Sequence, residues 1–325
     1  MRPNEDISIE DCRQLLVRLF VIGYTSCGES IVMLFVDGAT NKVLYTIVID
    51  SYKLSDGTFK TVDTLNEYKV NHIDLLCWTH PDADHSKGID EIFERYCDKD
   101  SVIFFPTYMN GLDTYPISYN KDDLAIINNM FGISNRKNKP VKPVGADRGM
   151  TGDRFTKYFS DGIHRFPLTL TIYAPHKDYL VEKIRNTKTQ SIKKNLLSIF
   201  MVASIGPYKF DFCGDVENAT INNMEEAPFD YPTFIKIPHH ASPNASSMLE
   251  KIVVDPSSLC CTTTYKSKGL PDPFVLEEYK TKVGYCHSTG IDADSNENYG
   301  IMEYTFDFFG KQEVSIVKHG NAHRV

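Results

Sequence analysis

Short runs of apolar and β-branched residues recur along almost the whole chain, and turn-forming residues separate many of them. Runs of this length and composition are typical of β-strands. The predicted strands cover residues 16–24, 30–36, 43–50, 73–78, 168–173, 197–204, 209–213, 233–237, 259–263, 283–286, 301–306 and 313–317. This pattern favours an α/β protein in which a few helices lie outside two sheets.

Helical spacing of apolar residues appears only in short stretches between these strands. It predicts helices at residues 89–96, 122–130, 179–185, 248–252 and 275–280. The pattern loosens between about 106 and 165, where Tyr, Asn, Asp, Gly and Pro are scattered. No internal repeat and no Gly/Ser-rich or Pro-rich linker divides the chain. We therefore expect a single domain over residues 1–325 with a variable insertion at about 106–165.

The composition excludes several classes of protein. Hydrophobic residues make up 42% and charged residues 24% of the 325 positions, which is ordinary for a globular chain. The formal net charge of −8 argues against a protein coated with basic surface for long duplex nucleic acid, although a local basic groove stays open. No apolar stretch reaches the ~20 residues of a membrane span.

Cysteine usage and the N-terminal sequence indicate the compartment. The eight cysteines contain no Cys-x-x-Cys pair, and several lie in apolar strand-like runs. Buried, reduced thiols have this distribution. The first residues lack the basic-then-apolar pattern of a signal peptide. We expect a cytoplasmic protein that does not associate with a membrane.

One segment, from Thr79 to Gly88, concentrates potential metal ligands directly after a predicted strand. Its side chains His80, Asp82, Asp84 and His85 supply two imidazoles and two carboxylates. A loop that leaves a strand end can aim alternating side chains at one point. This donor set suits Zn, or Mn and Fe where carboxylates dominate. A solvated acidic turn is the alternative, but such a turn rarely has an imidazole at each end of its carboxylate pair.

Two further strands end in polar residues of the same kind. Gly214-Asp215 follows the strand at 209–213, and His239-His240 follows the strand at 233–237. Asp215 could instead cap a helix, and adjacent histidines can be surface residues. With the segment that begins at Thr79, however, three acidic or imidazole groups follow apolar strands. We expect them to converge at one centre.

In their order and spacing these residues resemble the metallo-β-lactamase superfamily. The matching positions are Asp50 at a strand end, His80-x-Asp82-x-Asp84-His85, Gly214-Asp215 and His239-His240. The chain is most similar to the soluble metallo-β-lactamase-like domain of the competence protein ComEC. Further matches to that branch are Gly28-Glu29-Ser30, Asn195 with Ser198, and His239 to Ser242. The resemblance implies a four-layer αββα sandwich of two mixed β-sheets, the metallo-β-lactamase fold.

The sequence departs from the family pattern at two points. Asp82 stands where the family has a second histidine, and the separate middle histidine has no clear counterpart. His164 and His176 lie in the right interval, but each fits a loop histidine better. Asn195 or a water could complete that position instead. Oxygen ligands in place of imidazoles shift the preference of one position from Zn toward Mn or Mg.

The resemblance implies metal-assisted hydrolysis with two divalent ions, zinc or manganese, one of whose positions could be weak or empty. One ion would be held by His80, Asp82 and Asp215, and the other by Asp84, His85, His239 and the shared Asp215. A water between the ions would attack a phosphoryl or carbonyl centre.

The remaining residues of the motifs have supporting roles in this scheme. Asp84 and His240 are the candidate catalytic residues. His240 is either the proton donor to the leaving group or the ligand in place of His239. Asp50 is expected to orient a ligand, and Asn195 and Ser198 to orient or ligate.

Two basic stretches bear on the substrate. They contain Arg136, Lys137, Lys139 and Lys142, and Lys183, Arg185, Lys188, Lys193 and Lys194. Such runs are commonly solvated loops, but the second one leads directly into the strand of Asn195. It is therefore expected to border the site and attract phosphates, with Lys193 and Lys194 as substrate-binding residues. Tyr108, Tyr115 and Tyr119 could offer stacking surfaces for bases.

These patterns favour a metal-dependent phosphodiesterase or nuclease that acts on a phosphate-containing small molecule or a single-stranded nucleic acid. A homodimer is left open. One alternative is a lactonase or thioesterase at the same metal site, whose neutral substrate needs no cationic rim. The other is a non-catalytic binding protein with a degenerate site, which the metal content of the purified protein would reveal.

Overall fold

Two mixed β-sheets lie face to face in the computed structural model, which describes residues 6–107, 109, 119–147, 153–186, 192–224, 229–290, 295–308 and 314–325. The first sheet has the strand order β16 (Ser315–Gly320), β15 (Tyr299–Asp307), β2 (Leu15–Tyr24), β3 (Glu29–Asp37), β4 (Lys42–Ile49), β5 (Leu75–Cys77), β6 (Val102–Pro106) and β7 (Lys142–Val144). The second has the order β1 (Ile7–Ser8), β8 (Arg154–Ser160), β9 (Arg165–Ala174), β10 (Phe200–Ile205), β11 (Tyr208–Phe212), β12 (Phe234–Lys236), β13 (Leu259–Thr262), β14 (Tyr285–Ser288) and β17 (His323–Arg324).

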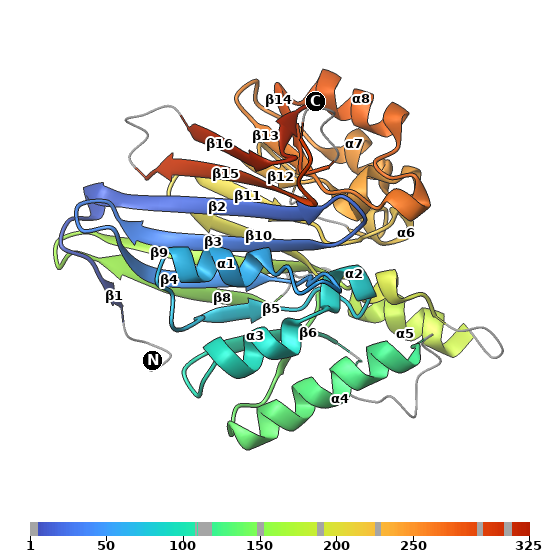
Figure 1. Cartoon of the computed structure of the whole chain (residues 1–325), viewed down its shortest axis with the longest axis horizontal. Helices are drawn as coiled ribbons and strands as arrows, with labels where there is room; N and C mark the ends of the chain where they lie inside the picture. The colour runs from blue at the N-terminus through green and yellow to red at the C-terminus, as the bar shows by residue number, and fades with distance from the viewer. Residues whose placement is uncertain are drawn as a thin grey trace.

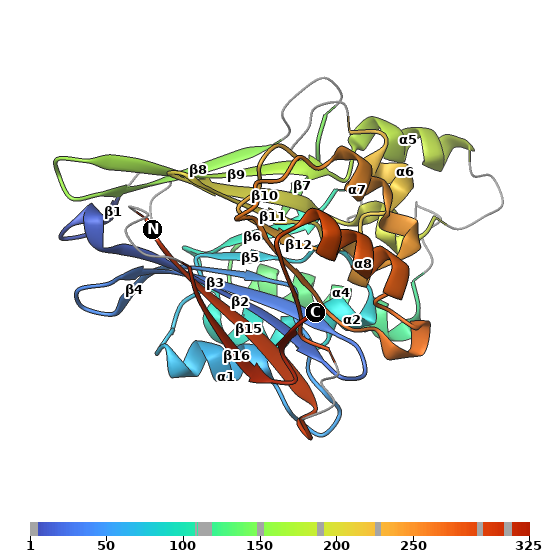
Figure 2. The same cartoon turned by 90° about the horizontal axis from the view of Figure 1, so that it is seen from above.

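Helices cover the outer faces of the two sheets. Three of them, α1 (Lys60–Glu67), α3 (Ile89–Tyr96) and α4 (Lys121–Arg136), lie against the first sheet, as Figure 1 shows. On the second sheet lie α6 (Asn218–Ile221), α7 (Ser247–Lys251) and α8 (Pro273–Lys282) (Figure 2). The short α2 (Ala83–Ser86) follows β5, and α5 (Lys177–Asn186) follows β9. The predicted four-layer αββα sandwich of two mixed sheets is confirmed.

Burial on both faces explains why the central strands are apolar at most positions. In β2, Val17, Leu19 and Val21 point into the core between the sheets. The alternate residues Phe20 and Ile22 pack on the helix side instead. Because successive side chains of a strand point to opposite faces, a strand covered on both faces is apolar on both sets of alternate positions.

Parallel pairing brings the motif-bearing loops to one edge of the sandwich. Strands β4 to β7 are parallel neighbours in the first sheet, and β11 to β14 are parallel neighbours in the second. The carboxyl ends of parallel strands lie at the same edge of a sheet, where open α/β sheets bind their ligands. Asp50 follows β4, the segment beginning at Thr79 follows β5, Asp215 follows β11 and the histidine pair follows β12.

The part of the region from 106 to 165 that the structure describes contains α4, which runs from Lys121 to Arg136 rather than over 122–130, and the strands β7 and β8, where the sequence pattern predicted no strand. The strand expected at 197–204 begins only at Phe200, because Lys194–Leu197 form a 3₁₀ turn, η2. None of the described helices combines the length and apolar character that crossing a bilayer requires.

Candidate metal centre

The segment after β5 buries most of its polar side chains, among them His80, Asp84, His85 and Ser86. Its two imidazoles, on His80 and His85, are 0% exposed. The hydroxyl of Ser86 accepts the indole N–H of Trp78 (3.0 Å) and donates to the carbonyl of Asp82 (2.6 Å). This internal bonding fixes the loop, so that the imidazoles are held in place without contact with solvent.

Asp50 holds His85 in one tautomer. Its carboxylate accepts the backbone N–H of Thr79 (2.7 Å), the hydroxyl of Thr79 (2.6 Å) and Nδ1–H of His85 (2.7 Å). Because a carboxylate can only accept, Nδ1 must carry the proton of a neutral His85 imidazole. The lone pair of Nε2 is then free to bind a metal ion.

Asp215 reaches the centre from the second sheet through a turn that requires glycine. Gly214 has a φ of 51°, and a Cβ at this position would lie 2.5 Å from Oγ of Ser198. The same hydroxyl accepts the N–H of Asp215 (2.8 Å). Oδ1 of Asp215 stands 3.3 Å from Nε2 of His85, so the two sheets meet at this pair of atoms.

The histidine pair lies in an unusual backbone turn. His239, His240 and Ala241 have φ values of 48°, 52° and 59°, which places three consecutive residues in the left-handed region. Each such residue costs roughly 1–2 kcal/mol, and strain of this kind collects at functional sites. The turn buries the imidazole of His240 completely, whereas the side chain of His239 remains 16% exposed.

A buried relay sets the tautomer of His240. The hydroxyl of Thr263 donates to Glu29 (2.7 Å), and its oxygen lies 2.7 Å from Nδ1 of His240. Since the hydroxyl proton is used, Nδ1 must be the donor and Nε2 carries the lone pair. Lys236 forms an ion pair with Glu29 (2.7 Å), and both side chains are buried.

Four ligand atoms converge in what we call the inner set, made of Asp84, His85, Asp215 and His240. These atoms all lie within 4.8 Å of one another. Nε2 of His240 lies 3.0 Å from Oδ2 of Asp84 and 3.8 Å from Oδ1 of Asp215. Ligands of a tetrahedral ion with bonds near 2.0–2.1 Å stand about 3.3 Å apart. The spacing of the inner set fits a divalent cation.

The chemistry of the inner set requires positive charge. In the neutral tautomers the Nε2 lone pairs of His85 and His240 face carboxylates, so each of these close contacts needs either a proton or a metal ion between its two atoms. Nε2 of His85 and Oδ1 of Asp215 have no hydrogen-bond partner among the described residues. Burial alone would lower the pKa of His85, but Asp215, Asp84 and Asp50 together raise it well above its usual value. The carboxylates around His85 thus favour a positive charge at this position, which either a proton on His85 or a metal ion bound to it can supply.

A second, looser group lies beside the inner set. Nε2 of His80 is 3.6 Å from Oδ2 of Asp82 and 3.7 Å from Oδ2 of Asp215. Nε2 of His239 is 3.9 Å from the same Asp215 oxygen and 3.5 Å from Nδ2 of Asn195. Within the described ranges, two groups have all their potential ligand atoms within 4.8 Å of one another. One is the inner set, and the other consists of Glu29, Asp50 and His85.

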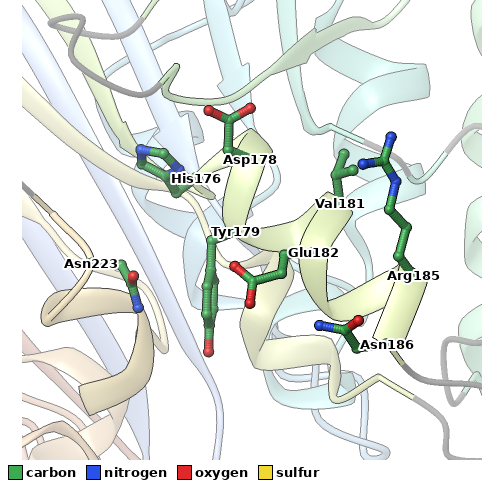
Figure 3. Close-up of a pocket in the computed structure, with 8 residues that line it drawn as sticks. All are labelled: His176, Asp178, Tyr179, Val181, Glu182, Arg185, Asn186 and Asn223. Carbon is green, nitrogen blue, oxygen red and sulfur yellow. The ribbon is translucent and has the colours of Figure 1, made fainter.

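The placement of the histidines revises the expected ligand sets. His240, rather than His239, lies with Asp84 and His85, because the left-handed turn directs His240 inward. Neither candidate for the middle histidine joins the centre. His164 is exposed and lies 3.1 Å from Asp161 at the turn between β8 and β9. Figure 3 shows His176 in a separate cavity of about 490 Å³ formed largely by α5.

The two basic stretches differ in where they lie relative to the centre. Lys194 lines the main cavity, which has a volume of about 760 Å³ and lies beside the metal ligands, as expected for a residue that borders the site. Its ammonium is bound to Asp82 and to Asp123 (2.9 Å). Lys193 is 71% exposed and 3.9 Å from Glu217, and it is not among the residues that line the main cavity. In the first stretch, Arg136 forms an ion pair with Glu94 of α3 (3.0 Å).

The remaining sequence candidates add little to the centre. Arg185 lines the separate cavity of Figure 3, and Lys188 lies outside the described residues. Tyr119 packs against the core on the helix side of the first sheet, so it offers no free ring to a base. Tyr108 and Tyr115 lie outside the described residues.

A cavity of about 760 Å³ opens beside the metal ligands. Asp84 and Asp215 of the inner set form part of its wall. Tyr265 and Lys268 lie on another part of this wall, and Lys268 has no carboxylate partner among the described residues. The sequence reasoning missed Lys268, because an isolated lysine in a polar loop carries no pattern.

Comparisons with known proteins give distant structural similarity only. No protein-family model and no curated protein sequence matches the chain. A candidate metal-dependent hydrolase from Parabacteroides distasonis matches with a TM-score of 0.39 and 10% identity, covering 82% of this chain and 91% of that one. A diphosphatase of the PhnP family matches with a TM-score of 0.38 and 11% identity, covering 90% and 99%. Both similarities are too low to transfer an activity to this chain.

Proposed function

We propose that this protein is a metal-dependent hydrolase that cleaves phosphate esters, as a phosphodiesterase or nuclease. The inner set carries this proposal. Two imidazole nitrogens and two carboxylate oxygens converge there, and two of these residues, Asp84 and Asp215, form part of the wall of a cavity of about 760 Å³. A buried cluster of acceptors beside an open cavity is the arrangement that a catalytic metal site requires.

The residues of the inner set would bind the ion, and Asp50 and Thr263 outside it would orient the two histidines. A divalent ion held there would polarise a phosphoryl oxygen and lower the pKa of a water molecule. His85 and His240 offer Nε2 because Asp50 and the relay through Thr263 hold their Nδ1–H groups. Asp84 lines the cavity, so its carboxylate can accept the proton of the attacking water.

The cavity wall is polar, and its carboxylates outnumber its lysines, so an anionic substrate would depend on the bound metal ion together with the donors of this wall. Asn120, Asn195 and Asn244 contribute amide groups, and Lys268 contributes a cation with no carboxylate partner within the described part of the chain. Phosphate oxygens accept hydrogen bonds from such groups. Tyr265 contributes an aromatic ring, on which a base could stack. A lactone or thioester carries no negative charge, so it would form no ion pair with Lys268 and would accept fewer hydrogen bonds from the amides than a phosphate does.

The test combines metal analysis with a hydrolysis screen. The purified protein is assayed with Zn²⁺, Mn²⁺ and Mg²⁺ against a bis-aryl phosphodiester, single-stranded DNA, cyclic nucleotides, a lactone and a thioester. We expect bound metal and cleavage of at least one phosphodiester. Cleavage of the lactone or thioester alone would favour the carbonyl-directed alternative. A folded protein with neither metal nor hydrolysis would be a binding protein.

Two substitutions locate the activity. We expect Asp84→Ala and His85→Ala each to lower kcat at least about 100-fold, comparable to losing one strong group that stabilises the transition state. The matched control is His164→Ala, which removes an exposed histidine on the turn between β8 and β9. Circular dichroism would establish that the variants remain folded. Unchanged turnover in either ligand variant at saturating metal would show that the inner set is not the centre.

A further inference from the structure

The ammonium group of Lys194 has no donor left for a substrate. It contacts a carboxylate oxygen of Asp82, lies 2.9 Å from a carboxylate oxygen of Asp123 and lies 3.4 Å from the carbonyl of Pro81. A lysine ammonium has three N–H donors, and these three acceptors match them. The side chain is only 15% exposed. Lys194 is therefore a fixed positive charge beside the loop of metal ligands.

The insertion supplies one of the two carboxylates that fix this charge. Asp123 lies in the first turn of α4, is 1% exposed, and also accepts the backbone N–H of Asn120 (2.9 Å). The helix terminus is thus anchored to the loop after β5 through Lys194. Two chain segments that are distant in sequence, α4 and η2, hold the ammonium against Asp82.

The other oxygen of Asp82 belongs to the looser group of ligands. Oδ2 of Asp82 lies 3.6 Å from Nε2 of His80, while Oδ1 of the same carboxylate contacts Lys194. An outer ion at His80 and Asp82 would therefore share one carboxylate with an ammonium. Like charges on the two oxygens of one carboxylate repel each other, and in a half-buried position this repulsion is poorly screened. Within the described residues, no lysine forms an ion pair with Asp84 or Asp215.

We propose that Lys194 is a built-in cation at the outer position of the centre. The inner set then holds one tightly bound divalent ion, and an outer ion binds more weakly because it shares the Asp82 carboxylate with the ammonium. This inference rests on the proposed function only in requiring that the inner set binds a metal ion. It assigns Lys194 to the positioning of charge rather than to substrate binding.

Metal stoichiometry tests the inference without an activity assay. The full chain is dialysed against low-micromolar Mn²⁺, and bound metal per chain is measured by mass spectrometry. We expect one ion in the wild type, two in Lys194→Met, and one in Lys194→Arg, which keeps the charge. Lys193→Met is the matched control, since it removes a neighbouring but exposed lysine, and it should bind one ion. His240→Asn should bind none at this concentration.

Each outcome has a definite meaning. Two equally tight ions in the wild type, or a folded Lys194→Met variant that still binds one ion, would overturn the role of Lys194. A folded wild type that binds no metal would instead overturn the proposed metal centre itself. Should Lys194→Met not fold, electron paramagnetic resonance of the Mn²⁺-loaded wild type decides the matter. An isolated six-line signal agrees with a single ion, and a spin-coupled spectrum contradicts it.

Discussion

Asp211 is a buried carboxyl group with no hydrogen-bond partner among the described residues. It is 0% exposed on β11, and burial raises its pKa from 3.8 to about 8. The folded chain therefore keeps a proton on Asp211 at pH 7 that the unfolded chain releases. The free energy of unfolding must therefore fall as the pH rises from about 4 to 8. The slope is about 1.4 kcal/mol per pH unit where Asp211 is fully protonated in the folded chain and fully ionised in the unfolded chain.

We expect Asp211→Asn to remove this pH dependence, because an amide cannot ionise. The free energy of unfolding, measured with urea at pH 6 and pH 9, should fall in the wild type and change much less in the variant. The two proteins should be nearly equal below about pH 4, where the carboxyl is protonated in both the folded and the unfolded chain, and the variant should be the more stable protein at pH 6 and pH 9. A wild type that is equally stable at both pH values would contradict the buried, neutral carboxyl.

Lys268 is the residue of the main cavity best placed to recognise phosphate. We expect Lys268→Ala to raise KM for a phosphodiester by about 10-fold and to change kcat little, since the charge acts alike on ground and transition states. KM for a neutral ester should not change. The control is Lys266→Ala, two residues away and not among the residues that line this cavity. Equal KM values in wild type and Lys268→Ala would remove the charge argument for a phosphate substrate.

Individual residues of the centre were only partly predictable from the sequence. Asp84, His85 and Asp215 follow apolar strands, which marks them without knowledge of the fold. Which of His239 and His240 points into the centre depends on the left-handed turn. The sequence does not predict this turn, because none of its three residues is a glycine. Thr263 and Lys236 read as ordinary strand residues, because their contacts with Glu29 come from a distant segment.

At the scale of elements, α4 offers a measurable test of its N-terminal cap. The side chain of Asn120 accepts the N–H groups of Asp122 and Asp123, and Asp123 returns a bond to the N–H of Asn120. We expect Asn120→Ala to lower the free energy of unfolding by about 1 kcal/mol. Urea unfolding would measure this change, with Asn129→Ala in the middle of the same helix as the control. An equal loss in both variants would show that capping is not the cause.

Elements whose apolar residues follow one period were predictable, and the others were not. The helix at 89–96 was found with its exact bounds, because Ile89, Ile92 and Phe93 make one apolar face. Helix α1 escaped notice because only Val62 and Leu65 are apolar within it. β7 is three residues long and contains Pro143, which disfavours a strand except at a sheet edge. Its place depends on tertiary contacts with β6.

At the scale of the whole molecule, a metal ion in the inner set would link the two sheets. Asp84 and His85 belong to the first sheet's loop, and Asp215 and His240 to loops of the second. A ligand that binds only the folded state stabilises it by an amount that grows with the logarithm of the ligand excess, about 2.7 kcal/mol at 100 times Kd. We expect chelation to lower the melting temperature of the wild type by several degrees and to leave His240→Asn nearly unchanged. Calorimetry with and without chelator measures both.

The division of the ligands between two sheets also has a consequence for the order of folding. The contact between Asp84 and His240 spans 156 positions of the chain, and neither half supplies a complete ligand set. Contacts of such long range form late, after local hairpins and helices have condensed. During refolding, the capacity to retain a metal ion should thus return only when the two halves have docked. The recovery of metal binding therefore reports when the two halves of the chain have docked, which is the final step of folding.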